Sequence, residues 1–536
     1  MAKVPTPVNE PVLSYAPGSA ERAALKQALD ACAAERVEIP VVVGAERVRT
    51  GKTVDVTMPH DHGHVLATAH MASAEHVGRA IDAAMKAREA WSRTPYEDRA
   101  AVFLRAAELL TTTWRSRVNA ACMLGQSKTC FQSEIDAVCE LADFWRFNVA
   151  FGERIRAEQP ISPKGQWNRL DHRGLEGFVF AITPFNFLSI AGNLPTAPIL
   201  MGNVALWKPA TTSLRGAWEL VELFRAAGLP DGVLQLIPGP GAEMANAALE
   251  SEHLAGIHFT GSTGTFKSLW RGVAERLDHY RTFPRLVGET GGKDFIVAHE
   301  SADPDALITA ITRGGFEYQG QKCSAASRIY VPRSMWPRIR DGVAADLETL
   351  RFGDVRDFTQ FGGAVIDERA YDKIASYVDL AKTTAKVVAG GTCDKSVGWF
   401  IHPTLVEVES PKHRLMEEEI FGPIVTVYPY DAPFEDVLRL CDETSPYALT
   451  GAIFANDRAA ARLAEDVLRD AAGNFYVNDK PTGAVVGQQP FGGARLSGTN
   501  DKAGMYLNLL RWVSPRSIKE NLAPPTDYRY PFLAEK

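Results

Sequence analysis

The middle of the chain alternates short apolar runs with longer stretches of helical periodicity. The apolar runs predict strands at residues 178–182, 204–207, 233–237 and 256–259, and the periodic stretches predict helices at 194–201, 213–227, 242–249 and after 262. The second of these helices ends before Gly228 and Pro230, which together form a stop signal. Strands that alternate with helices in this way predict an α/β fold with a parallel, doubly wound sheet, which binds ligands at the carboxyl ends of its strands.

The N-terminal third is richer in helical patterns. We predict a Pro-rich arm and an Ala-rich helix within residues 1–35, short strands at 41–43 and 54–56, and helices at 73–91, 96–115 and 134–154. Three histidines, His60, His62 and His64, lie between the strands and the next helix. We interpret them as part of a polar turn rather than a metal site, because no carboxylate or thiol cluster completes a ligand set.

Composition places the chain among ordinary globular proteins. Its 536 residues are 46% hydrophobic and 23% charged, which suits a large core and roughly two to four domains. The net charge of −7 argues against a nucleic-acid partner or a polybasic membrane contact. We expect no membrane span, since no apolar run reaches about eighteen residues. We see no signal or transit peptide and expect a cytoplasmic location, although a matrix protein stripped of its transit peptide would look the same.

The cysteines are seven in number, scattered, and without a C-x-x-C pair. This usage predicts reduced thiols rather than disulfides or a zinc site. Cys323 stands out, because it follows a helix expected to begin at Asp303 and Pro304 and precedes a strand expected at 327–331. A cysteine at such a turn is reachable, and the neighbouring Lys322 would favour its thiolate. The alternative is that it only packs, as most buried cysteines do.

A second stretch, L-V-G-E-T-G-G-K-D-F at 286–295, places Glu289 among glycines, where the backbone can approach a bound molecule. By itself this pattern is equally typical of a solvated turn. Taken together, E-T-G-G-K and the later Q-G-Q-K-C resemble the aldehyde dehydrogenase superfamily in order and separation. The resemblance implies that Cys323 is the nucleophile and Glu289 the general base. It also implies that Asn186, in T-P-F-N-F, stabilises the oxyanion, whereas the plain interpretation is an asparagine that stabilises its own turn.

The resemblance also implies an NAD site. The motif G-x-G-x-x-G is incomplete, because Met244 follows Gly239 and Gly241 where a third small residue belongs. The positions that match the family's cofactor contacts are instead Pro184, Lys208, Gly261, Ser262, Glu419 and Phe421. Without the resemblance, Lys208 would be a surface lysine and Ser262 a helix N-cap. No glutamate stands three residues after Lys208, so the preference for NAD over NADP rests on the family branch.

A narrower resemblance covers nearly the whole chain, from N-E-P-V-L near residue 9 to 482–502. It is to the monofunctional branch of the family that oxidises glutamate γ-semialdehyde to glutamate in proline catabolism. It implies that Ser324, Gly483 and Ala484 bind the substrate carboxylate and that Phe187 and Phe491 enclose its aliphatic part. Two alternatives remain: a dehydrogenase of another carboxylated semialdehyde, such as succinate semialdehyde, and a non-catalytic binding or structural protein on the same fold.

The family architecture implies two doubly wound parallel-sheet domains and a small β-hairpin oligomerisation flap. We assign residues 1–157 to an arm and the helical part of the cofactor domain, 158–176 to the flap and 177–288 to the NAD-binding domain. Residues 289–480 form the catalytic domain, and 481–536 hold the substrate-anchor loop and a C-terminal oligomerisation tail. We expect a homodimer or higher oligomer that binds no metal, and a transient contact with a proline dehydrogenase is conceivable.

Overall fold

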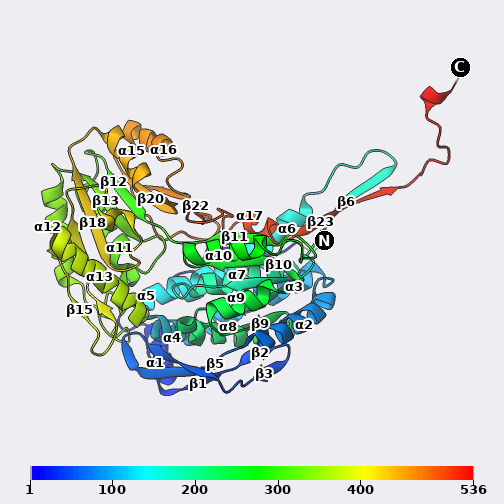
Figure 1. Ribbon diagram of the computed structural model, residues 1–536, viewed down its shortest axis with the longest axis horizontal. Coiled ribbons are helices and arrows are strands. Elements are labelled where there is room, and N and C mark those ends of the chain that lie inside the picture. The colour runs from blue at the N-terminus through cyan, green and yellow to red at the C-terminus, as the bar shows by residue number, and fades with distance from the viewer. Residues whose placement is uncertain (1–2, 535–536) are drawn as a thin grey trace.

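Two parallel sheets organise the computed structural model, which describes residues 3–534 (Figure 1). The first sheet has the order β11-β10-β7-β8-β9, and all of its strand pairs are parallel. Its strands are β7 (Phe178–Ile182), β8 (Val204–Lys208), β9 (Leu234–Leu236), β10 (Leu254–Thr260) and β11 (Arg285–Glu289). The sequence therefore predicted its first four strands to within two residues at each end.

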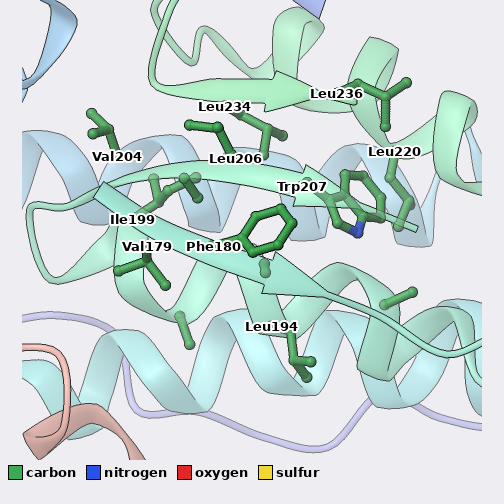
Figure 2. Packing of buried hydrophobic residues seen from close by; sticks show 14 of the residues in the cluster. Val179, Phe180, Leu194, Ile199, Val204, Leu206, Trp207, Leu220, Leu234 and Leu236 are labelled. Atoms are coloured by element: carbon green, nitrogen blue, oxygen red, sulfur yellow. The ribbon is translucent and has the colours of Figure 1, made fainter. Parts of the chain in front are cut away.

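The core of the first sheet explains why its strands read as continuous apolar runs. Helices cover both faces, so side chains of either orientation are buried. Figure 2 shows Phe180 and Leu206, which are partners in the register of β7 and β8, packed with Trp207 among the surrounding helices. The domain is thus a three-layer unit of the kind that the alternating pattern predicts.

The second sheet has the order β14-β17-β18-β13-β12-β20-β21 and is parallel except at the edge pair β14 and β17. Its strands are β12 (Asp294–Ala298), β13 (Ala326–Pro332), β14 (Lys386–Ala389), β17 (Thr404–Glu407), β18 (Ile424–Tyr430), β20 (Thr450–Phe454) and β21 (Asn474–Val477). It forms a separate lobe in Figure 1, with β12, β13 and β18 at its centre. Two parallel sheets flanked by helices confirm the predicted fold class.

Helices surround both sheets. In the first part of the chain they are α1 (Ala20–Ala34), α2 (Ala74–Trp91), α3 (Tyr96–Thr111), α4 (Arg115–Gln126), α5 (Cys130–Ser133), the π-helix η1 (Glu134–Glu140), α6 (Leu141–Ala157), α7 (Leu188–Leu200), α8 (Leu214–Ala227), α9 (Gly241–Leu249) and α10 (Thr263–Ala274). In the second part they are α11 (Pro304–Phe316), α12 (Trp336–Thr349), α13 (Glu368–Thr384), α14 (Arg414–Glu417), α15 (Phe434–Thr444), α16 (Arg458–Val467) and α17 (Tyr506–Leu510), with short 3₁₀ turns at Thr211–Ser213, Glu317–Gly320 and Pro531–Leu533. No helix within residues 3–534 has the length and apolar character needed to cross a membrane.

Helix α7 begins at Leu188, six residues before the expected start, and contains two prolines. Each proline lacks an N–H and leaves the carbonyl four residues earlier without its helical partner. For Pro198 that carbonyl belongs to Leu194, and His258 Nδ1 lies 2.8 Å from it. A histidine from β10 thus replaces the lost bond, and the helix continues through Pro198.

Smaller strands complete the N-terminal part. They are β1 (Val37–Ile39), β2 (Val41–Val43), β3 (Glu46–Val48), β4 (Thr53–Met58) and β5 (Asp61–His70). Four further short strands occur later in the chain: β15 (Cys393–Asp394), β16 (Phe400–Ile401), β19 (Tyr447–Ala448) and β22 (Ala494–Arg495). The three histidines lie where β4 turns into β5, and buried His60 is 3.2 Å from Ser127 Oγ. No group of three or more His, Cys, Asp or Glu side chains within residues 3–534 is placed to hold a metal.

The flap is built from two distant segments. Strand β6 (Gln166–Arg173) pairs antiparallel with β23 (Ser514–Asn521) over eight residue pairs, and Figure 1 shows this ribbon projecting from the body. The expected hairpin within 158–176 therefore supplies one of these two strands, and the C-terminal tail supplies the other. Short-range turn signals could not reveal this pairing, because it joins two segments that are far apart in the sequence.

Candidate active site

Cys323 follows a tight turn after α11. Tyr318, Gln319 and Gly320 all adopt left-handed backbone conformations, with φ of 52°, 53° and 63°. At Gly320 a Cβ would lie 2.5 Å from the carbonyl oxygen of Gly422, so a side chain cannot fit. Gln319 holds the turn, since its amide accepts from Gly363 N at 2.9 Å. Non-glycine residues in this region cost conformational energy and cluster at functional sites.

Glu289 ends β11, where it pairs with Thr260 of β10. Glu289 and Cys323 line the same cavity of about 460 Å³. Burial, with a smaller contribution from Asp501, raises the pKa of Glu289 to about 8, while Lys502 opposes the shift. This carboxyl is thus mostly protonated at neutral pH and becomes a competent base above it.

The environment of Cys323 disfavours its thiolate. Burial raises its pKa well above the usual value, and the carboxylates of Glu289, Asp294 and Glu419 add to the effect. The expectation that Lys322 favours the Cys323 thiolate is wrong, because the Lys322 ammonium is buried and lies 3.1 Å from Glu317 Oε2. The lysine is committed to that ion pair, and the thiol is neutral before a ligand enters.

Asn186 lies just after β7 and is buried. Its Nδ2 donates to Gln321 O at 3.1 Å, which joins the end of the first sheet to the turn before Cys323. A side-chain amide carries two N–H donors. One bond to Gln321 therefore leaves a second donor for an oxyanion near Cys323.

The residues expected to bind the substrate carboxylate also border this cavity. Ser324 Oγ donates to Thr482 Oγ1 at 2.9 Å, and Gly483 has a φ of 95° that favours glycine. The cavity is also lined by the following predicted residues: Phe187, Ser324, Gly483, Ala484 and Phe491. The structure thus brings the proposed nucleophile, base and substrate contacts together around one space.

An acidic network beside the cavity was missed from sequence. Asp136 accepts hydrogen bonds from the first amides of α7, at 2.9 Å from both Leu188 N and Ser189 N, and forms an ion pair with Lys128. Glu140 lines the cavity, and its carboxyl accepts from Ser189 Oγ at 2.8 Å. The only sequence signal is E-I-D-A-V-C-E at 134–140, an acidic run inside a helical pattern, where buried carboxylates are unexpected.

Glu140 is unusual in its charge state. Burial, followed by the nearby charge of Asp136, raises its pKa to about 8. The Glu140 carboxyl is therefore mostly protonated at neutral pH. A cation placed beside it would lower this pKa and ionise the carboxyl.

The residues expected to hold NAD lie outside this cavity, at the ends of the first sheet's strands. Lys208 ends β8, and its largely buried ammonium has no hydrogen-bond or ion-pair partner among residues 3–534, so it suits ribose hydroxyls. Ser262 caps α10 by accepting from Thr265 N at 3.2 Å, beside Gly261. A helix N-terminus of this kind suits a phosphate. These groups fit a dinucleotide.

Two further predicted contacts come from the catalytic domain. Glu419 accepts from Gly292 N at 3.0 Å, and a Cβ on Gly291 would lie 2.1 Å from its Oε1. The glycine motif after Glu289 thus leaves room for this carboxylate. Phe421 has a φ of 62° and packs edge-on against Phe185, with ring centroids 5.9 Å apart, one residue after Pro184. These residues line the boundary between the two sheets' domains.

A parallel sheet whose strand ends suit a dinucleotide, beside a cavity lined by a cysteine and a glutamate, is typical of an oxidoreductase. The sequence comparison agrees: the chain belongs to the aldehyde dehydrogenase family, whose model matches residues 47–516. Within the family it is 49% identical over 540 residues to "Delta-1-pyrroline-5-carboxylate dehydrogenase, mitochondrial" of Dictyostelium discoideum, covering 100% of this chain and 97% of that protein. A crystal structure of the Delta-pyrroline-5-carboxylate dehydrogenase of Mycobacterium tuberculosis is 52% identical, with a TM-score of 0.97 over 100% of this chain and 99% of that chain. A second structure of the same protein, described as bound with NAD, has a TM-score of 0.96 at the same identity and coverage.

Proposed function

We propose that this protein oxidises L-glutamate γ-semialdehyde, the open form of 1-pyrroline-5-carboxylate, to L-glutamate with NAD. One observation carries the proposal: Cys323 and Glu289 line the same cavity as Ser324, Gly483 and Ala484. A cavity that joins a cysteine and a carboxyl to a hydroxyl and two backbone N–H groups suits a semialdehyde that carries a carboxylate. The resemblance to named dehydrogenases of this substrate supports the same conclusion.

Cys323 starts the reaction by attacking the aldehyde carbon. Only the thiolate is an effective nucleophile, so the raised pKa of Cys323 means that a proton must first leave it. The resulting oxyanion lies within reach of the Asn186 amide and the Cys323 backbone N–H. One such donor typically contributes about 3 kcal/mol to transition-state stabilisation.

When NAD is bound, it supplies the hydride acceptor that turns this adduct into a thioester. We assign the dinucleotide to Lys208, Ser262 and Glu419, which lie at a strand end, at a helix N-terminus and beside the glycines after Glu289. Glu289 then removes a proton from the water that attacks the thioester. This step frees glutamate and restores the thiol, and it requires the deprotonated form of Glu289.

The substrate's charged end needs partners, because burying an unpaired carboxylate is prohibitive. We assign the carboxylate to the Ser324 hydroxyl and the N–H groups of Gly483 and Ala484. We assign the α-ammonium to Glu140, the carboxyl with a raised pKa that lines the same cavity. Phe187 and Phe491 enclose the aliphatic part between the two ends.

NADH formation by the purified protein with a panel of aldehydes tests the proposal. Glutamate γ-semialdehyde should give the highest kcat/KM, above succinate semialdehyde and simple aliphatic aldehydes. Cys323→Ala should abolish oxidation and leave NAD affinity, measured by calorimetry, largely unchanged. A higher kcat/KM for succinate semialdehyde would assign the protein to that substrate instead, and no oxidation of any aldehyde would favour a non-catalytic role.

We further propose that the protein forms a homodimer or higher oligomer through the flap. The flap exposes large apolar side chains, of which Ile161, Trp167 and Leu522 are 91%, 53% and 66% exposed. Solvent-exposed apolar side chains on a projecting ribbon favour contact with another copy. Light scattering after gel filtration tests this, and a monomeric mass at micromolar concentration would contradict it.

The domain limits proposed from sequence, and the cytoplasmic location, stay predictions. The limits 177–288 and 289–480 follow the two sheets, each of which has its own buried core. The seven thiols are all free, which suits either cytoplasm or mitochondrial matrix. The mitochondrial label in the name of the Dictyostelium relative supports the matrix in a eukaryotic source.

A further inference from the structure

The segment before α1 is fixed to the body by polar contacts along its length. We call residues 3–15 the arm. The Glu10 carboxylate forms ion pairs of 2.8 Å with Arg115 and 2.7 Å with Arg146. Further along, the Tyr15 hydroxyl donates to Glu134 Oε2 at 2.7 Å. The arm is therefore held in one place although it forms no helix or strand.

Asn9 is the point where the arm meets the substrate side of the cavity. Its Nδ2 donates to Asp143 Oδ2 at 2.8 Å and to Val486 O at 2.9 Å. Its Oδ1 accepts from Gln488 Nε2 at 3.1 Å. Asp143 also accepts from Glu10 N at 2.7 Å, so one buried carboxylate of α6 orients the arm at this point. Asn9 thus joins α6 to the loop that follows Thr482.

That loop, residues 482–489, carries the two amides assigned to the substrate carboxylate. Its own bonds form a single turn, with Gln488 N and Gln489 N both 3.0 Å from Val485 O. Gly483, which precedes the turn, and Gly487, which lies within it, have φ of 95° and 81°. Gly483 and Ala484 come before the residues that the turn's bonds join, so those bonds do not fix the direction of their amides.

The arm also forms part of the cavity wall. Asn9, Glu10 and Val12 line the same space as Cys323 and Ser324. The arm is thus adjacent to the substrate and bonded to the loop that binds it.

We propose that the arm belongs to the substrate-binding apparatus and that Asn9 is a positioning residue. By holding Val486 O and Gln488, Asn9 keeps the amides of Gly483 and Ala484 directed at the carboxylate. It touches neither the reacting aldehyde nor Cys323. The inference rests on the proposed function, because it concerns the end of the cavity that selects a carboxylated substrate.

Asn9→Ala in the full chain tests the inference by comparing two substrates. KM for glutamate γ-semialdehyde should rise roughly threefold to tenfold, the loss expected of a hydrogen-bonded contact, with kcat nearly unchanged. The kcat/KM for propanal, which has no carboxylate, should stay within about twofold of the parent. The matched control is Asn456→Ala, the same change at an exposed asparagine outside the cavity, which should leave both KM values near parental.

A second variant separates positioning from mere stability. The exchange Asn9→Asp with Asp143→Asn keeps a donor and an acceptor between the arm and α6, because the amide of the new asparagine can donate to the new carboxylate. It places a carboxylate against Val486 O, so that bond to the loop is lost, while the oxygen that accepts from Gln488 Nε2 remains. The melting temperature should return close to parental, while KM for glutamate γ-semialdehyde stays raised.

Hydrogen exchange of residues 482–489 gives a reading that does not depend on which aldehyde is oxidised. Exchange should accelerate in Asn9→Ala and in Gln488→Ala but not in the surface control Asn456→Ala. Parental exchange in both variants, or an equal loss of kcat/KM for both aldehydes, would overturn the inference. Failure of the unmodified protein to oxidise glutamate γ-semialdehyde would overturn the proposed function alone, since the exchange data would still report on the tether.

Discussion

The Lys322 ammonium lies 3.1 Å from Glu317 Oε2 and is thereby held in an ion pair rather than directed to the thiol next to it in sequence. Cys323 is left among carboxylates, and its pKa is raised. A raised pKa lowers the share of thiolate at neutral pH, and the thiolate is the reactive form of a cysteine.

Alkylation of Cys323 measures this directly. Its reaction with iodoacetamide should be slow at pH 7 and should accelerate only at strongly alkaline pH, because only the thiolate reacts and the pKa of Cys323 is raised. Glu289→Gln should shift the profile to lower pH, since it removes one of the carboxylates that raise the pKa. Peptide mass spectrometry follows the site, with Cys323→Ala as the blank. A rate that is already maximal at pH 7 would show that the thiol ionises freely.

The role of Glu289 predicts a change in the rate-limiting step. Glu289→Gln should retain the first turnover and slow thioester hydrolysis, so rapid mixing should show a burst of NADH before a slow steady state. In the unmodified enzyme the hydrolysis rate should rise with pH through about 8, because the carboxyl must lose its proton to act as a base. If the first turnover slows equally and no burst appears, Glu289 acts earlier, on the thiol.

The turn before Cys323 predicts a stability effect with a matched control. Gly320→Ala should destabilise the fold by more than about 1 kcal/mol, because it combines a left-handed backbone with a clash against Gly422 O. Gly228 has a φ of 94° but open space around its Cα, so Gly228→Ala should show the backbone cost alone. Thermal unfolding compares the two. Equal losses would mean that the turn before Cys323 relaxes to accept the side chain.

Much of this fold was predictable because the informative signals are local. Asp303 caps α11 by accepting from Asp305 N and Ala306 N, as expected for aspartate before proline. Strand β7 has the predicted limits because both its faces are buried and its apolar run is unbroken. The motifs around Cys323 and Glu289 also located residues that share one cavity.

What could not be predicted depends on distant parts of the chain. The pairing of β6 with β23 joins strands that are far apart in the sequence. The direction of Lys322 is set by Glu317, which the motif alone does not reveal. Glu140 belongs to no recognised motif, and its importance appears only when the π-helix η1 places it against the cavity.

Glu140 predicts a distinction between two carboxylated substrates. Glu140→Gln should raise KM for glutamate γ-semialdehyde several-fold, because a hydrogen bond to a charged group contributes about 1.5–3 kcal/mol. Succinate semialdehyde lacks the α-ammonium, so its KM should change little. Steady-state kinetics with both substrates make the comparison, and equal weakening would assign Glu140 to the architecture of η1 instead.

Ser324→Ala tests the central claim, that this cavity selects its aldehyde by the remote carboxylate. The hydroxyl has one proton, which it donates to Thr482 here and must turn toward the substrate carboxylate, so Ser324→Ala deletes one donor of the site. KM for glutamate γ-semialdehyde should rise several-fold while kcat/KM for propanal stays nearly unchanged, and the surface change Ser268→Ala should alter neither. Equal weakening of both substrates, or a parent enzyme that prefers succinate semialdehyde, would contradict the account.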